Sequence, residues 1–174
     1  MVTRSRVKFS HTKSGEKEYL FNLLKEKDWF VANNFSVFLP KNELDVKKII
    51  LKKVDFKKKI IFLKHSWGKI EADFFSIIKN FKFIKHQPSY YCHVSLYGPE
   101  GKFCRPNFIF VRLRTKRDYV RVVETIGHEL LHLMLKGYFN KNKFSYRQVE
   151  KKVDDLIMNT KLHDLFPNYE KQIF

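Results

Sequence analysis

The stretch ETIGHELLHLML, residues 124–135, places two histidines four positions apart, with a glutamate directly after the first. Residues four apart lie one turn above each other on the same face of an α-helix, so His128 and His132 can direct two imidazole nitrogens at one point. Glu129 would lie about 100° further round the helix. In an H-E-x-x-H arrangement the histidines bind zinc, and the glutamate reaches the water on the metal's open position. The spacing therefore predicts a zinc site with Glu129 as general base.

A helix that buries two ordinary core histidines is the alternative interpretation, because a motif this short also arises by chance. The neighbouring side chains favour the metal site. They are apolar at Ile126, Leu130, Leu131, Leu133, Met134 and Leu135. Two imidazoles and a carboxylate buried among them without partners would cost free energy, whereas a metal ion satisfies both rings at once.

A catalytic zinc site needs a third protein ligand and keeps its fourth position for water. Downstream, YRQVEKKVDDLI places Glu150 early in the next predicted helix and Asp154 one turn beyond, on the same face. We expect Glu150 to be the third ligand and Asp154 to accept a hydrogen bond from a liganding histidine's other nitrogen. Asp155, which points about 100° away from Asp154, and His163, well downstream, are the weaker candidates.

With these residues the chain resembles the gluzincins, zinc metallopeptidases defined by H-E-x-x-H and a downstream glutamate on a separate helix. It is most similar in layout to the very small minigluzincin-like peptidases. The similarity covers about residues 60–160 and rests on HELLH at 128–132 and EKKVD at 150–154. It implies an α+β zincin-like single domain, in which a mixed sheet carries a backing helix, an active-site helix and a glutamate helix. It also implies zinc-dependent hydrolysis of a peptide or protein substrate.

Larger gluzincins draw a hydrogen-bond donor for the transition state from a C-terminal subdomain. No such subdomain is expected after the glutamate helix, so the resemblance does not place this donor. By residue type alone, the candidates are Tyr138, Tyr146 and His163.

Hydrophobic periodicity predicts the elements that position the motif. Apolar residues recur at helical spacing in 14–31, 42–54 and 69–81, and the last of these helices is expected to back onto a sheet. Strands are predicted at 35–39, at the end of 56–67, at 89–98 and at 103–113. The segment GPEGK, residues 98–102, is predicted to close a hairpin between the last two strands.

Two helix starts carry capping signals. Thr115 precedes the motif helix, which is expected to end near Gly137. Ser145 and Gln148 form an S-x-x-Q capping box, so a helix is predicted at about 146–159.

Three further residues have chemically useful types. His93 would share one face of the predicted strand with Tyr91, Ser95 and Tyr97. That face lines a substrate cleft or, as we expect, is a solvated face of the sheet. Cys92 and Cys104 lack the paired spacing of a zinc knuckle, and both are predicted to be small core residues.

The net charge of +17 would attract nucleic acid or anionic surfaces. The basic residues are spread along the chain, so a merely compositional origin is the other interpretation. The alternative function is therefore a nucleic-acid-binding protein whose metal site is structural. A DNA-linked protease, similar to SprT-like proteins, would combine the two functions.

The chain has 174 residues, of which 44% are hydrophobic, enough for one packed domain. We expect a basic N-terminal region at 1–60, a metallopeptidase domain at 61–162 and a C-terminal tail at 163–174. The tail could cover the cleft and hold the enzyme latent. Neither a membrane span of roughly 20 apolar residues nor a signal peptide is visible, and two cysteines cannot form a disulfide framework. A cytoplasmic protein without membrane contact is the expectation.

Overall fold

The computed structural model describes residues 6–33, 35–81, 83–104 and 106–171. Its elements in chain order are β1 (Arg6–Ser10), α1 (Lys13–Lys25), α2 (Lys27–Ala32), α3 (Glu43–Leu51), α4 (Phe56–Gly68), α5 (Glu71–Ile78), β2 (Ser89–Ser95), β3 (Gly101–Cys104), β4 (Phe108–Arg112), α6 (Lys116–Lys141), α7 (Tyr146–Met158) and α8 (Leu162–Leu165). The fold is α+β, with one mixed sheet.

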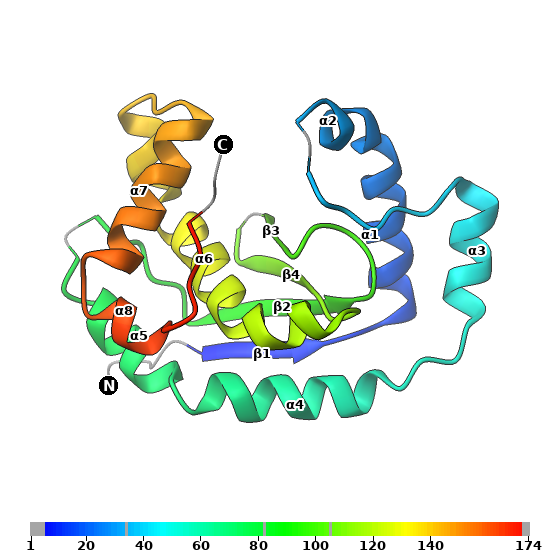
Figure 1. Cartoon of the computed structure of the whole chain (residues 1–174), viewed down its shortest axis with the longest axis horizontal. Helices are drawn as coiled ribbons and strands as arrows, with labels where there is room; N and C mark the ends of the chain where they lie inside the picture. Colours follow the sequence, from blue (N-terminus) through cyan, green and yellow to red (C-terminus); the bar gives the residue numbers. More distant parts are fainter. Residues whose placement is uncertain (1–5, 34, 82, 105, 172–174) are drawn as a thin grey trace.

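The four strands lie in the order β1-β2-β4-β3. β2 pairs in parallel with both β1 and β4, whereas β3 runs antiparallel to β4. The N-terminal residues therefore contribute one edge strand to the same sheet that carries β3 at its other edge. Figure 1 shows this sheet at the centre, with α1 to α3 to its right, α7 and α8 to its left, and α6 running across the sheet toward α7.

The two faces of the sheet pack against different helices, because successive strand residues point to opposite sides. One face joins the main core with α4, α5 and α6. Its strand residues are Val7, Phe9, Tyr90, Cys92, Val94, Ile109 and Val111. The other face meets α1, where the Tyr19 ring stacks on Phe110 with centroids 4.2 Å apart. Helices thus cover both faces and leave β3 at an open edge.

The predicted strand at the end of 56–67 is wrong, because this segment is the helix α4. Asp55 caps its first turn by accepting a hydrogen bond from the Lys58 amide. Leu63 and Trp67, four residues apart, are buried on one helical face, whereas Lys57, Lys58 and Lys64 are exposed. An amphipathic lysine-rich helix and an interrupted strand look alike over so few residues.

The predicted hairpin through GPEGK is also wrong. β2 and β3 are not neighbours, and the hairpin joins β3 to β4, with Cys104 paired to Phe108. Pro106 lies in the turn of that hairpin. Since proline cannot donate to a strand ladder, the apolar run 103–113 divides there into two strands.

The remaining predicted elements are present with shifted ends. The helix predicted at 14–31 divides into α1 and α2 at Glu26, the helix at 42–54 is α3, and the one at 69–81 is α5. Of the strand predicted at 35–39, a single bridge from Phe38 to Gly98 forms. The capped helices at Thr115 and Ser145 are confirmed, although α6 continues past Gly137 to Lys141.

Two smaller expectations have different outcomes. Cys92 is a buried core residue as predicted, but the prediction for Cys104 is wrong because its side chain is exposed at the end of β3. Within the described residues, no helix combines the length and apolar character needed to cross a membrane.

Candidate metal centre

The helix α6 carries the H-E-x-x-H motif into the interior. His128, Glu129 and His132 are 4%, 8% and 3% exposed, respectively. Because His128 and His132 are four residues apart, their rings lie on one face, and their Nε2 atoms are 2.9 Å apart. The motif histidines therefore point at a common place, as their spacing predicts.

The start of α6 is tied to the sheet by a buried ion pair. Asp118 forms a capping box with Thr115 and accepts hydrogen bonds from the guanidinium of Arg112, at 2.8 Å from Nη2. Arg112 ends β4, and both side chains are buried. This pair fixes where the motif helix leaves the sheet.

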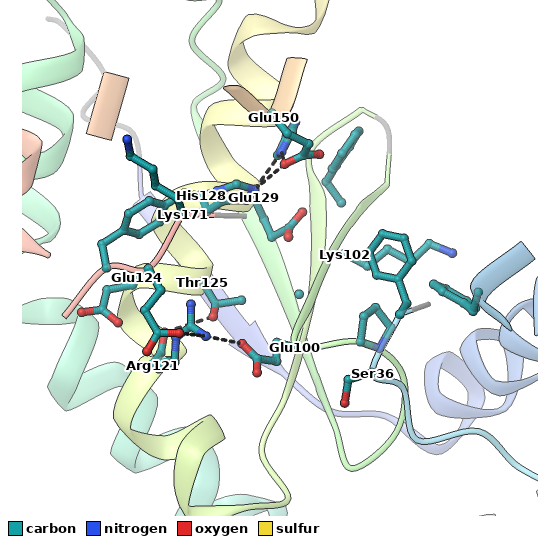
Figure 2. A pocket seen from close by; sticks show the side chains of 18 of the residues that line it. Ser36, Glu100, Lys102, Arg121, Glu124, Thr125, His128, Glu129, Glu150 and Lys171 are labelled. Atoms are coloured by element: carbon teal, nitrogen blue, oxygen red, sulfur yellow. Dashed lines mark hydrogen bonds and ion pairs between the residues drawn. The ribbon is translucent and has the colours of Figure 1, made fainter. Parts of the chain in front are cut away.

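Glu150 on α7 completes the group. Its Oε2 lies 3.1 Å from His128 Nε2 and 3.2 Å from His132 Nε2, and the residue is 4% exposed. Figure 2 shows Glu150 reaching down toward His128. The Ser145 capping box starts α7 one turn before Glu150, and so places the carboxylate opposite the histidines. The three predicted ligands are thus brought together.

The donor set of this group suits a metal ion, and all three ligand atoms lie within 4.8 Å of one another. Two Nε2 atoms at 2.9 Å can share only one proton, yet both also face one carboxylate oxygen. A cation at this point would accept a lone pair from each of the three atoms. Furthermore, His132 Nδ1 is buried with no hydrogen-bond partner among the described residues, so hydrogen bonding alone leaves the group incomplete.

The far nitrogen of His128 is hydrogen-bonded to the C-terminal segment. His128 Nδ1 lies 2.7 Å from the Tyr169 hydroxyl, which donates to Asp154 Oδ1 at 2.6 Å. With the hydroxyl hydrogen directed at Asp154, the Tyr169 oxygen accepts the Nδ1 proton and leaves the Nε2 lone pair toward Glu150. Asp154 was expected to bind a histidine directly. At His128 it acts instead through Tyr169, a residue that no sequence motif marks.

Glu129 lies beside the group and faces β3. A Cβ atom at Gly101 would be only 2.6 Å from Glu129 Oε1, so the glycine leaves the space that the carboxylate occupies. Burial, together with the negative charge of Glu150, raises the pKa of Glu129 to about 7, although the charge of His128 opposes the shift. Glu150 shows the opposite shift. Its burial would raise the pKa, but hydrogen bonds from His128 and His132 outweigh burial and lower it to about 2.

A cavity of about 720 Å³ opens in front of these residues, within the range of ligand pockets. It is bounded by α6 and α7 on one side and by α2 and the segment after it on the other, with β3 between them. In Figure 2, His128 and Glu150 lie across the cavity from Ser36 and Lys102. The candidate metal group therefore borders a space large enough for a substrate.

The other residues selected from the sequence lie in different places. Of the three donor candidates, Tyr146 lines the cavity and is hydrogen-bonded to Glu150, whereas Tyr138 and His163 do not line it. His163 is exposed on α8, and Asp155 does not belong to the metal-binding group.

His93 belongs to a second buried cluster rather than to a solvated sheet face, so that expectation is wrong. Its Nε2 lies 2.9 Å from Glu16 Oε2, and Ser95 donates to Glu16 Oε1 at 2.7 Å. His11 completes a second group that could hold a metal ion. However, its Nδ1 already lies 2.8 Å from the Val94 carbonyl oxygen, to which it can donate. Hydrogen bonds thus account for this cluster, which anchors α1 to β2.

Comparison with protein-family models, with curated proteins and with solved structures finds no match for this chain. A function can therefore be inferred only from the residues and geometry of the site itself.

Proposed function

We propose that the chain is a zinc metallopeptidase of gluzincin type, with His128, His132 and Glu150 as zinc ligands. The observation that carries the proposal is the meeting of two Nε2 atoms and one carboxylate oxygen at a buried point beside a cavity. Two imidazoles and a glutamate are an established ligand set of catalytic zinc, which keeps one position open. A zincin-like role for α6 as active-site helix and α7 as glutamate helix belongs to the same proposal.

A zinc ion bound there would polarise the carbonyl group to be cleaved and activate a water molecule. Glu129 would accept a proton from the attacking water and pass it to the leaving amine nitrogen. Its position supports this role, because the carboxylate lines the cavity without belonging to the ligand group. Tyr146, also on the cavity wall, is the candidate donor to the substrate carbonyl oxygen.

Substitution of Glu129 by glutamine tests the proposal. Glu129→Gln should keep about one zinc per chain, since the ligands are intact, but lower peptide cleavage by roughly 10²-fold or more, because both proton transfers are lost. His132→Ala should lose the zinc as well. Metal analysis beside a peptide cleavage assay measures both properties. A metal-replete preparation of the parent protein without zinc or a comparable divalent ion would contradict the proposal.

Nucleic-acid binding is the second candidate function, because α3, α4 and the segment between them carry many exposed lysines. The exposed lysines on α3, on α4 and between these helices do not line the cavity. They are Lys47, Lys48, Lys52, Lys53, Lys57, Lys58 and Lys64. Contacts to phosphates would make the logarithm of the affinity fall steeply with the logarithm of salt concentration. Binding of duplex DNA across a salt series therefore tests this candidate separately from proteolysis.

A further inference from the structure

The end of the cavity formed by α2 is aromatic. Its residues are Trp29, Phe30, Phe35, Phe103 and Tyr146, which we call the aromatic wall. They come from four separate parts of the chain: α2, the segment after it, β3 and the start of α7. No helical or strand periodicity connects them, so only the tertiary fold makes them one surface.

The aromatic wall is continuous with the candidate metal group. The Phe103 ring stacks on the ring of His132, with centroids 4.9 Å apart. On the other side of the group, Tyr146 is hydrogen-bonded to Glu150 and meets Trp29 edge-on, with centroids 6.3 Å apart. A side chain next to a peptide bond held at the metal group would therefore reach this wall first.

Much of the wall is available to a ligand, although its base is rigid. Trp29 and Tyr146 are 48% and 47% exposed, whereas Phe30 beneath them is 3% exposed. Trp29 packs on Phe35 with centroids 5.1 Å apart, so its indole is supported from behind. Large aromatic side chains that are supported but half exposed are typical anchors for an apolar group.

Charge at this end is already neutralised within the protein. Lys102, which lines the cavity at this end, forms an ion pair with Glu26. Lys136 also lies near the wall, with its Nζ 5.1 Å from the centre of the Phe103 ring, but it does not line the cavity. At the opposite end of the cavity, Arg117 and Arg121 both pair with Glu100 and Glu170. The cavity thus offers a substrate an apolar wall at one end and internally paired charges at the other.

From this arrangement we propose that the aromatic wall selects peptides with a large apolar side chain, aromatic or long aliphatic, beside the bond that is cleaved. This inference rests on the proposed peptidase function and adds its substrate class. An apolar side chain bound there would be removed from water and would contact the aromatic rings. A small or charged side chain would leave the aromatic surface exposed to water.

The zinc-loaded full chain should be tested with peptides of equal length that carry Phe, Leu, Ala or Asp at one position, on either side of the cleaved bond. On one of these sides, we expect kcat/KM for Phe to exceed that for Ala roughly 10- to 100-fold, as a hydrophobic pocket allows. Trp29→Ala should reduce this ratio to within about threefold, because the apolar side chain loses its exposed ring contact. Phe83→Ala, at an aromatic residue that is 62% exposed and does not line the cavity, is the matched control and should keep the ratio.

A binding measurement separates the inference from the proposed function. In zinc-loaded Glu129→Gln, which should bind without cleaving, tryptophan fluorescence reports on Trp29, because the other tryptophan, Trp67, is 1% exposed and outside the cavity. The Phe peptide should change the signal and bind more tightly than the Ala peptide. Cleavage without preference, a preference that survives Trp29→Ala, or equal binding of the two peptides would each overturn the inference and leave the peptidase proposal standing. If the parent cleaves no peptide but still binds the Phe peptide more tightly, the proposed peptidase function is wrong, whereas the binding preference of the aromatic wall is retained.

Discussion

Each motif histidine has one ring nitrogen at the point where three side chains meet and one nitrogen turned away from it. At His128 the second nitrogen is held by Tyr169, and at His132 the whole ring is covered by Phe103. The Tyr169 hydroxyl fixes both the orientation and the tautomer of His128, whereas the Phe103 ring restricts only the orientation of His132. The geometry of the candidate centre therefore depends on residues outside the ligand set.

Removal of the Glu150 carboxylate should cost most of the metal affinity. Glu150→Ala leaves only two nitrogens, so we expect a loss larger than the roughly 10- to 100-fold typical of outer partners. Asp155→Ala on the same helix is the matched control and should change little. Titration against a chromophoric zinc chelator measures both. If Glu150→Ala retains zinc as tightly as the parent, the gluzincin assignment fails even with both histidines in place.

Loss of the Tyr169 hydroxyl should weaken the metal site from a distance. Tyr169→Phe keeps the ring but removes the link between His128 Nδ1 and Asp154, so the zinc affinity should fall about 10-fold. Tyr138→Phe, at a tyrosine on the same helix as the motif but outside the cavity, should have no such effect. Equal affinities in the two variants would show that the hydroxyl does not position the histidine.

At the scale of the elements, α6 is oriented by its buried N-terminal ion pair. Asp118 accepts hydrogen bonds from the Arg112 side chain and from the backbone amides of Arg114 and Thr115. One carboxylate thus caps the helix and joins it to the end of β4. The direction in which the motif histidines point follows from this junction.

Asp118→Asn should destabilise the protein by about 3 kcal/mol near neutral pH, because it leaves the buried Arg112 cation without its partner. Burial opposes ionisation of Asp118, but the hydrogen bonds from Arg112 and the backbone prevail and hold its pKa below the ordinary value. A folded-state pKa below that of the unfolded chain gives stability that is present above about pH 4 and lost as the pH falls. Urea unfolding should therefore show a large difference in the free energy of unfolding between parent and variant at pH 7, and a smaller difference at pH 3. An unchanged difference would argue against the carboxylate as its source.

At the scale of the whole molecule, the C-terminal segment is part of both the core and the cavity. Phe166 is 0% exposed, and a Cβ atom at Gly127 would be 2.3 Å from its ring. Tyr169, Glu170 and Lys171 line the cavity. The segment that lines one side of the cavity therefore also supports the candidate metal group through Tyr169.

Two truncations should separate these contributions. A chain ending at Leu162 loses Phe166 and should be destabilised by about 3–5 kcal/mol, as for other buried aromatic residues. A chain ending at Tyr169 keeps Phe166 and the hydroxyl at His128, but lacks Glu170 and its ion pairs with Arg117 and Arg121. If the tail restrains the enzyme, this second chain should stay folded and cleave peptides several-fold faster. Unchanged cleavage by the folded chain would reject latency.

Local signals determined much of the framework. Helix caps at Thr115 and Ser145 were predictable because a cap forms between residues three apart. The spacing of His128 and His132, with Glu150 one turn into the next helix, was enough to predict that the three would meet. Zinc binding and peptide hydrolysis by this group remain predictions.

The predictions from the sequence are wrong where the structure of a segment depends on residues far away in the chain. Segment 56–67 became a helix because Leu63 and Trp67 pack on the core, and His93 is buried because α1 brings Glu16 to it. Local periodicity does not contain these contacts.

The sequence by itself determined the spacing of the candidate ligands, the two capped helices and an α+β composition, since each depends on residues close together in the chain. Only the tertiary structure decided that Tyr169 holds His128, that Gly101 makes room for Glu129, and that Trp29 meets Tyr146 edge-on at one end of the cavity. These three contacts join segments that no local rule relates. Their formation depends on how all the elements pack around one sheet, where burial of apolar surface rewards the complete arrangement rather than any single pair.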